Sequence, residues 1–465
     1  MGDSPPSVLV IASDTIGERM AGSGIRYWNL ARVIGAQQPV TLATPNDTTL
    51  DAPAGVTIAP YGAADASEDE RGTSLATLIE RHDVVVAQHL PYLYTDAAIL
   101  NSRHLVVDLY APWVLEKLEY ARLDPQRGEP NRKDDVAILN RLLNLGDFFI
   151  CASERQRDFW LGALAATGRL SLEHVSADPS LRTLVDVVGF GLPADPPQHT
   201  GAGLPDRFPA IGPDDPVVIW NGGLWNWLDP LTAIRAIAIV REQSPDVRLV
   251  FMGVRSPGAQ VAEMGIVDEA MSLARQLGLI DQHVFFNDWV PYDQRQNWLL
   301  DASAAISLHV ETAEARFAYR TRMLDTLWCG LPSIATGGDV LADLIRDTGI
   351  GEVVPASQPD TVAEAIVRVL DPARNAETRD QVRQLAVTYT WEQVTEPLLR
   401  YCIAPWRLGD RSEDERDRYL HELERQYTET AQYARHLEQV LDARKVPAPL
   451  TSRLRAVAAR RLRSR

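Results

Sequence analysis

Short apolar runs rich in β-branched residues recur through the first half of the chain, with longer stretches of helical apolar spacing between most of them. These runs are Val8–Ala12, Val40–Ala43, Val84–Ala87, Leu105–Val107, Phe148–Ala152 and Val187–Phe190. Strands that alternate with helices are typical of a parallel sheet covered by helices on both faces. The first half is therefore predicted to form one doubly wound α/β domain, residues 1–190.

The pattern stops at a segment dense in proline and glycine and then starts again. Residues 191–216 have the composition of an interdomain linker. The apolar runs that follow are Val217–Trp220, Val247–Met252, Val284–Phe286, Ala304–Leu308, Ser333–Thr336 and Glu352–Val354. They predict a second doubly wound domain over residues 217–410, closed by a packed terminal helix. Open α/β sheets bind ligands at the carboxyl ends of their strands, so we expect a cleft between the two domains to hold the site.

A charged extension follows the second domain. Residues 411–443 carry Leu423, Tyr427, Leu437 and other apolar positions at spacings of four and three, which is a weak heptad pattern. This helix is expected either to pair with a second copy in a homodimer or to lie on the body of the protein. The predicted fold class is α/β, with two Rossmann-like domains facing a cleft and a C-terminal helical extension.

Charge is distributed unevenly along the 465 residues, whose formal net charge is −17. The final segment, residues 444–465, holds eight Lys or Arg and no acid. An acidic body argues against a nucleic-acid groove, whereas the basic tail is expected to contact an anionic membrane surface or to act as a disordered solubilising tail. Three cysteines without paired spacing indicate reduced thiols. With no secretion signal or membrane-spanning run in the sequence, we expect a cytoplasmic protein, peripheral at the inner face of the membrane.

The stretch Glu311–Asp339 is the strongest candidate for the active site. It places acids, arginines and glycines around a short helix between two apolar strands. Arg320 and Arg322 are expected in the first turn of that helix, with Asp325 on the same face. Guanidinium groups at a helix N-terminus suit a phosphorylated anion. The alternative is an ordinary solvated ion-pair face.

Other candidates fall where predicted strands end. Gly22 and Gly24 follow the first strand in a loop longer than a βα turn needs, through which a backbone can approach a ligand. Asp108 follows another strand of that domain. In the second domain, Gly222-Gly223 opens a turn before Trp225 and Trp227, whose flat faces suit a sugar or a base. No metal-binding spacing of Cys, His or Asp is present, so we expect no metal.

Together these motifs resemble the GT-B fold and, within it, the retaining glycosyltransferases of family 4. The resemblance covers roughly Val8 to Trp406 and is carried by the Gly22-Ser-Gly24 loop, DFFICASERQRDFWLGAL, NGGLWNWLDPLTAIRA and LDTLWCGLPSIATGGD. The Cys329-Gly-Leu-Pro332 ending places the second Glu of the family motif at Asp325, which is expected to hold the donor ribose. The first Glu would fall at Phe317, so Glu314 or Glu311 must replace it.

The resemblance implies transfer of a sugar from a nucleotide-diphosphate sugar to an acceptor hydroxyl, with retention and without metal or other cofactor. The basic pair of the family would fall near Gly223 and Leu228, so Arg320 and Arg322 are assigned to the leaving diphosphate. Glu314 is assigned to the donor sugar, and Asp108 with the Gly22 loop to the acceptor. The donor site is expected to include Gly22, Gly24, Gly222, Gly223, Trp225, Asp325, Gly338 and Asp339.

Two alternatives accompany this interpretation: a non-catalytic protein that binds sugar nucleotides or acts as a scaffold, and a GT-B sugar-nucleotide epimerase. The acceptor is expected to be a carbohydrate or a lipid-linked molecule, in the synthesis of cell-surface polysaccharide or glycolipid.

Overall fold

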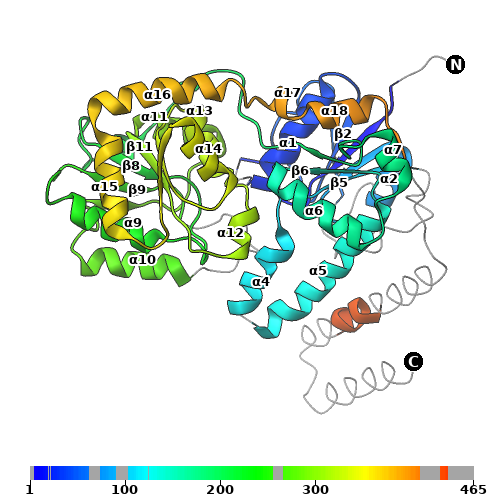
Figure 1. The fold of residues 1–465 in the computed structure, drawn as a ribbon, viewed down its shortest axis with the longest axis horizontal. Coiled ribbons are helices and arrows are strands. Elements are labelled where there is room, and N and C mark those ends of the chain that lie inside the picture. Colours follow the sequence, from blue (N-terminus) through cyan, green and yellow to red (C-terminus); the bar gives the residue numbers. More distant parts are fainter. Residues whose placement is uncertain are drawn as a thin grey trace, which may run out of the picture. The chain divides into compact units, whose positions relative to one another are not determined.

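Two parallel sheets, each covered by helices, make up most of the chain (Figure 1). The computed structural model describes residues 5–18, 20, 22–61, 74–90, 103–123, 125–254, 265–408 and 430–437. Both sheets form because their strands are apolar on both faces, so each strand requires a helix layer above and below it. This is the architecture predicted from the sequence.

The first sheet has seven strands in the order β3-β2-β1-β4-β5-β6-β7, and every pairing is parallel. The strands are β1 (Val8–Ile11), β2 (Val40–Thr44), β3 (Val56–Pro60), β4 (Val84–Ala87), β5 (His104–Asp108), β6 (Phe148–Cys151) and β7 (Val185–Val187). The strand order changes direction between β1 and β4, where Val8 pairs with Val84. Loops at the carboxyl ends of these two strands therefore diverge and leave a crevice.

The second sheet has six parallel strands in the order β10-β9-β8-β11-β12-β13. Its strands are β8 (Val217–Trp220), β9 (Arg248–Phe251), β10 (Val284–Phe286), β11 (Ala304–Ser307), β12 (Ser333–Thr336) and β13 (Gly351–Val354). Here the order changes direction between β8 and β11. The loop after β8 and the segment after β11 thus border the equivalent crevice of this sheet.

Strand positions agree with the sequence pattern except at two places in the first sheet. β3 was not predicted, because this edge strand buries only Val56 fully and so has no continuous apolar run. β7 ends at Val187, the residue at which the predicted strand begins. The apolar residues Val188 and Phe190 that follow are buried in irregular chain instead.

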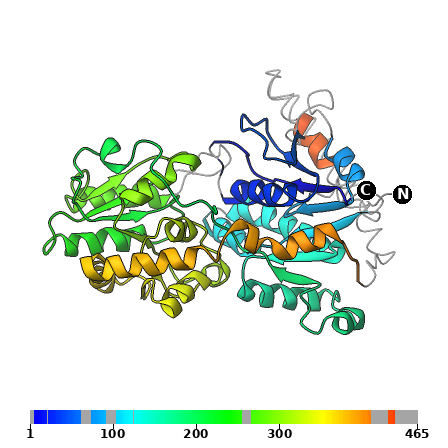
Figure 2. The ribbon, with the colours of Figure 1, turned by 90° about the horizontal axis from the view of Figure 1, so that it is seen from above.

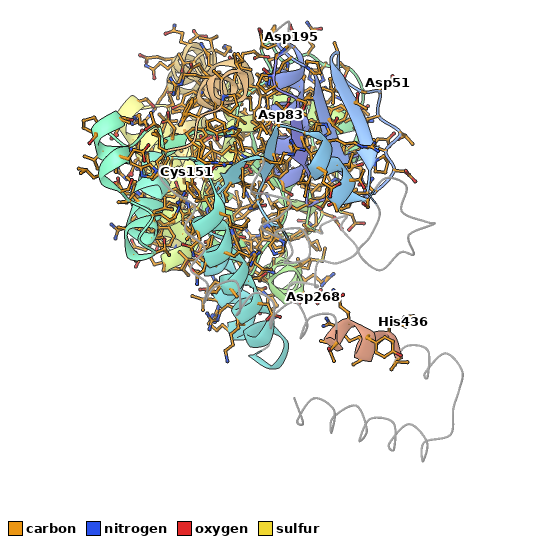
Figure 3. The ribbon with its side chains drawn as sticks, turned by 90° about the vertical axis from the view of Figure 1, so that its right-hand side faces the viewer. Asp51, Asp83, Cys151, Asp195, Asp268 and His436 are labelled. Atoms are coloured by element: carbon orange, nitrogen blue, oxygen red, sulfur yellow. The ribbon has the colours of Figure 1, made fainter. Side chains whose placement is uncertain are left out.

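Helices cover both faces of each sheet, as two views at right angles make clear (Figures 1 and 2). In the first half they are α1 (Gly22–Gly35), α2 (Leu75–Arg81), α4 (Trp113–Leu123), α5 (Pro125–Leu145), α6 (Glu154–Ala166), α7 (Leu172–Ala177) and α8 (Leu204–Arg207). In the second half they are α9 (Pro230–Val240), α10 (Gly265–Gln276), η3 (Tyr292–Gln294), α11 (Arg295–Asp301), α12 (Ala313–Phe317), α13 (Arg322–Trp328), α14 (Val340–Thr348), α15 (Pro359–Leu370) and α16 (Pro372–Ala386). Cys151 lies buried at the end of β6 (Figure 3), and all three cysteines are free.

The last helices return to the first sheet, which corrects the expected boundary of the second domain at residue 410. α17 (Trp391–Val394) and α18 (Glu396–Ile403) both contact α1. Tyr401 stacks on Phe148 of β6 with ring centroids 4.7 Å apart. Burial of these aromatic side chains anchors the returning segment on the first domain. The apolar pattern of a helix in the sequence does not show which domain that helix covers.

The predicted linker 191–216 is not wholly irregular. It contains the short helix α8, and the Leu192 amide donates to the Tyr389 carbonyl oxygen at 2.7 Å. The predicted linker is therefore hydrogen-bonded to the segment that returns to the first sheet.

Residues 430–437 of the charged extension are helical, and Tyr433 among them is exposed. The rest of the predicted heptad helix and the basic tail 444–465 lie outside the described residues. In the described part of the chain, no helix is long and apolar enough to cross a membrane.

Candidate functional site

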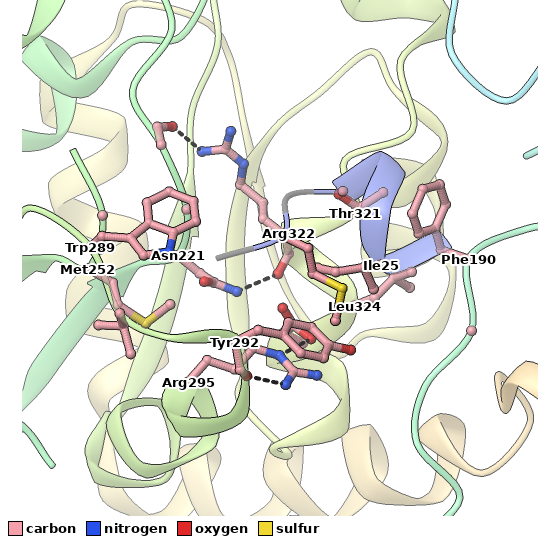
Figure 4. Close-up of a pocket in the computed structure, with 18 of the residues that line it drawn as sticks. Ile25, Phe190, Asn221, Met252, Trp289, Tyr292, Arg295, Thr321, Arg322 and Leu324 are labelled. Atoms are coloured by element: carbon pink, nitrogen blue, oxygen red, sulfur yellow. Dashed lines mark hydrogen bonds and ion pairs between the residues drawn. The ribbon is translucent and has the colours of Figure 1, made fainter. Parts of the chain in front are cut away.

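A cavity of about 210 Å³ opens where the carboxyl ends of β1 and β8 approach each other. Its walls come from both sheets, from the start of α1, the loops after β8, β9 and β10, and helices α11 and α13 (Figure 4). The strand orders change direction next to β1 and β8, whose following loops border the cavity, so it occupies the place where open α/β sheets bind ligands. We call it the donor pocket.

Arg322 is the cation at the centre of the donor pocket. It begins α13, and its backbone carbonyl oxygen accepts a 2.9 Å hydrogen bond from Asn221 at the end of β8. Its Nη1 donates to the Gly223 carbonyl oxygen at 2.9 Å. Among the described residues, no carboxylate forms an ion pair with it. Burial, aided by the charge of Arg320, lowers the pKa of Arg322 to about 9. A buried cation that forms no ion pair with a described carboxylate favours an anionic ligand.

The turn after β8 depends on glycine. Gly222 has a φ of +90°, a conformation that a side chain disfavours. A Cβ there would lie 3.7 Å from the guanidinium carbon of Arg322. The backbone and the guanidinium therefore approach each other closely, and the turn presents its carbonyl oxygen to Arg322.

Asp325 lies one turn further along α13 and is held by a second arginine. Arg295 Nε donates to Asp325 Oδ1 at 2.9 Å, and its Nη1 donates to the Tyr292 carbonyl oxygen at 2.6 Å. The guanidinium also lies over the Tyr292 ring, 3.7 Å from its centre. This fixes the Asp325 carboxylate at the pocket wall, where its second oxygen remains available to a ligand hydroxyl.

The far end of the donor pocket is uncharged. Met252, Gly253, Trp289 and Val290 line it. The Trp289 indole nitrogen is buried, and none of the described residues forms a hydrogen bond with it. A flat apolar slot with one free donor suits a heteroaromatic ring.

A second cavity of about 390 Å³ adjoins the donor pocket and shares with it Gly22, Phe190, Trp225, Thr321 and Arg322. Its other walls include Tyr110, Trp113 and Glu116 from the first domain and Glu314 and Arg320 from the second. Arg320 donates to both Glu314 oxygens, at 3.0 and 3.3 Å. We call this space the acceptor-side cavity.

Comparison with known proteins identifies the fold and the domain at this site. Residues 215–372 match the family described as Glycosyl transferases group 1. The chain has the GT-B fold, and its second domain is similar to the group 1 glycosyl transferases.

The sequence relatives of this GT-B chain include two named D-inositol 3-phosphate glycosyltransferase. The one from Acidothermus cellulolyticus is 28% identical over 40% of this chain and 40% of its own length. The one from Actinosynnema mirum is 26% identical over 48% of this chain and 52% of its own length. The chain therefore spans about half the length of these relatives or less.

Solved structures share the GT-B fold at low sequence identity. Anabaena HepE, solved in complex with UDP and glucose, is 15% identical with a TM-score of 0.61, over 86% of this chain and 100% of that one. Sucrose-phosphate synthase from Thermosynechococcus elongatus is 15% identical with a TM-score of 0.56, over 85% and 98%. WaaG, a glycosyltransferase involved in lipopolysaccharide biosynthesis, is 15% identical with a TM-score of 0.56, over 86% and 100%.

The GT-B chain brings together six of the residues expected at the donor site. Gly22, Gly222, Gly223, Trp225, Arg322 and Asp325 all line the donor pocket. Arg322 and Asp325 were expected to share a solvent face, but they point to different partners, Gly223 and Arg295. The alternative of a simple surface ion pair between them is therefore wrong.

Asp108 does not occupy its expected position facing the cleft. Its carboxylate is fully buried and accepts from Arg26 Nε at 2.6 Å and Nη2 at 3.0 Å. Arg26 also donates to the carbonyl oxygens of Val188 and Gly189, both at 2.9 Å. The pair joins α1 to the ends of β5 and β7, so Asp108 is not placed to contact an acceptor.

Arg320 lies outside the first turn of α13, and its fork is occupied by Glu314 rather than directed at the donor pocket. The physical reason is that Glu314, 2% exposed, requires a counter-charge. Arg320 is thus a positioning residue for Glu314. Asp339, at 3.7 Å from Arg320 Nε, caps α14 by accepting from the Ala342 amide at 2.7 Å.

Three expected donor residues do not line the donor pocket. Asp339 has the capping role just described. Gly338 accepts a 2.5 Å hydrogen bond from Arg155 on its carbonyl oxygen. A Cβ on Gly24 would lie 2.7 Å from the Thr15 carbonyl oxygen, so this glycine allows α1 to pack on its own loop.

Sequence reasoning missed Arg295, Trp289 and Glu116. Arg295 and Trp289 come from the segment after β10, where no glycine pair or acid motif draws attention. Glu116 lies on α4, and nothing in the sequence distinguishes it there from the other charged residues of the helix. The position of Trp289 in the loop after β10 was the one available signal.

No group of three or more His, Cys, Asp or Glu in the described ranges could hold a metal ion.

Proposed function

We propose that this protein transfers a sugar from a nucleotide-diphosphate sugar to an acceptor hydroxyl. The observation that carries the proposal is Arg322, a partly buried cation at the junction of the donor pocket and the acceptor-side cavity, with which no described carboxylate forms an ion pair. A diphosphate at this position would supply the missing negative charge. The group 1 domain and the names of the relatives support the same reaction class.

The walls of the donor pocket suggest an orientation for the donor. The base lies in the uncharged slot beside Trp289 and Val290, and Asp325 accepts hydrogen bonds from the ribose hydroxyls. The diphosphate lies against Arg322 and the free amides at the start of α1, where Gly22 removes any side chain from its path. The sugar then projects toward the acceptor-side cavity and Glu314.

Catalysis in this proposal rests on positioning and on charge. Arg322 stabilises the negative charge that grows as the diphosphate departs, which lowers the barrier selectively. The acceptor hydroxyl arrives on the face from which the diphosphate leaves, and a diphosphate oxygen takes its proton. The anomeric configuration is retained, and a guanidinium performs the task that a divalent cation performs in other transferases.

The wider setting follows from the charged extension. We propose synthesis of a cell-surface polysaccharide or glycolipid, with the basic residues 444–465 on the anionic inner face of the membrane. The residues 411–443 are proposed to pair two copies. If the tail carries the membrane contact, the full chain sediments with anionic liposomes and a 1–443 truncation does not. Equal sedimentation of the two would contradict it.

A panel of nucleotide-diphosphate sugars tests the proposed reaction. We expect at least one to release its nucleoside diphosphate slowly in buffer and faster when carbohydrate acceptors are added, with one glycosidic product of retained configuration. Binding of a donor without any release would favour a non-catalytic protein. Inversion at C2 of the free sugar nucleotide would favour an epimerase.

A further inference from the structure

The acceptor-side cavity contains an acid that no part of the donor assignment uses. Glu116 lies on α4, one helical turn after Trp113, so the two side chains share one face of the helix. Both line the cavity. Within the residues that the structure describes, nothing forms a hydrogen bond or an ion pair with the Glu116 carboxylate.

Trp113 supplies the complementary group. Its side chain is 7% exposed, and no residue that the structure describes forms a hydrogen bond with its buried indole nitrogen. A buried donor left without a partner is costly, and the partly exposed Glu116 carboxylate offers an acceptor on the same helix face. A hydroxyl group satisfies both at once, because it accepts from the indole N–H and donates to the carboxylate.

The remaining charges of the cavity are balanced without Glu116. Glu314 and Arg320 neutralise each other across 3.0 Å, and Arg322 is directed to the donor diphosphate. Burial and the charge of Glu314 raise the pKa of Glu116 to about 7, with Arg320 and Lys117 opposing. Once a donor diphosphate occupies Arg322, no described cation of the cavity lining remains to balance Glu116 above its pKa.

The other walls are aromatic. Trp225 and Trp227 stack with ring centroids 5.5 Å apart and planes 9° apart, and both border the cavity. Tyr110 and Tyr319 lie on its first-domain and second-domain sides respectively. Flat aromatic faces pack well on the C–H faces of a sugar or cyclitol ring.

We propose that Glu116 and Trp113 form the acceptor-specificity pair of this enzyme and select a neutral polyhydroxylated ring over a phosphorylated one. This inference rests on the proposed function. With the donor bound, a phosphate in this cavity would face Glu116 and the donor diphosphate, while both guanidiniums of the lining, Arg320 and Arg322, are already occupied, so it would be repelled. The chain would then differ in acceptor from the relatives named for D-inositol 3-phosphate.

The test compares matched acceptors with the donor found in the panel described above. Each pair contains a neutral ring and its phosphate: myo-inositol and D-inositol 3-phosphate, methyl glucoside and glucose 6-phosphate, methyl mannoside and mannose 6-phosphate. We expect the neutral member of each productive pair to have a kcat/KM at least tenfold higher. A preference for the phosphates, or donor turnover without use of any neutral ring, would overturn the proposal.

Variants separate specificity from folding. Glu116→Gln should raise KM for the neutral acceptor about tenfold or more, the effect of one hydrogen bond to a charged group. Glu116→Lys should shift the preference toward the phosphorylated member of the pair. Glu119→Gln, on the same helix but paired with Arg122, should leave both constants unchanged. An unchanged KM in Glu116→Gln would overturn the pair, whereas absence of donor turnover in the wild type would refute the proposed function itself.

Discussion

Arg295 holds Asp325 at the wall of the donor pocket through a 2.9 Å hydrogen bond from Nε to Oδ1. The two residues are brought together from α11 and α13, and the guanidinium is itself anchored by the Tyr292 ring and carbonyl oxygen. Arg295 is only 7% exposed. Its role is therefore to fix the carboxylate that we assign to ribose.

This arrangement predicts matched kinetic effects of the two residues. Asp325→Asn should raise the donor KM by about ten- to a hundredfold, because a hydrogen bond to a charged group contributes about 1.5–3 kcal/mol. Arg295→Met should raise the same constant, and the double variant should be no worse than Asp325→Asn alone. Steady-state kinetics with varied donor measures this.

Asp380→Asn is the control, since Asp380 and Arg383 form an exposed ion pair within α16, away from α11 and α13. Fully additive effects of the Arg295 and Asp325 changes would mean that the two act on the donor independently.

Arg322 should influence the chemical step more than donor binding. Arg322→Ala is expected to lower kcat by more than it raises KM, because the charge it faces grows as the diphosphate leaves. Arg322→Lys should recover only part of the loss, since an ammonium lacks the guanidinium fork. Arg346→Ala, an exposed arginine paired with Asp343, serves as control. A pure KM effect in Arg322→Ala would assign it to ground-state binding instead.

Most strands could be predicted from the sequence because buried parallel strands are continuous apolar runs. Pairings between side chains that lie far apart in the sequence could not be predicted in this way. Asp108 and Arg26 are 82 positions apart, and a strand-end acid looks the same whether it faces a ligand or a buried arginine. Arg320 and Glu314 both line the acceptor-side cavity, but their bidentate pairing, which removes Arg320 from the diphosphate, depends on the irregular chain between α12 and α13.

The buried ion pair between Arg26 of α1 and Asp108 of β5 should contribute strongly to the free energy of unfolding. Arg26→Met leaves the fully buried Asp108 carboxylate without a counter-charge and should cost about 3–5 kcal/mol of unfolding free energy. Arg32→Met, on the same helix, removes an exposed pair with Glu392 and should cost less than about 1 kcal/mol. Thermal unfolding of both variants measures the difference, and equal shifts would contradict the assigned role of Asp108.

The free energy of unfolding should depend on pH through the ionisation of Glu116. Its pKa is raised from 4.5 to about 7 by burial and by Glu314, against Arg320 and Lys117. Between these two values the folded protein keeps a proton that the unfolded chain has lost, so this group reduces stability as pH rises through the window. Glu116→Gln should therefore unfold at a higher temperature than the wild type at pH 8 and at the same temperature near pH 4.

Glu119→Gln should follow the wild type at both pH values. A Glu116→Gln curve that also follows the wild type at pH 8 would mean that the carboxylate is solvated or paired.

Calorimetric titration with nucleoside diphosphates and the matching monophosphates tests the central claim that the donor diphosphate binds at Arg322. For the preferred base, we expect the wild type to bind the diphosphate at least tenfold more tightly than the monophosphate. Arg322→Ala should lose that difference, whereas Arg346→Ala should keep it. An undiminished preference for the diphosphate in Arg322→Ala would contradict the account.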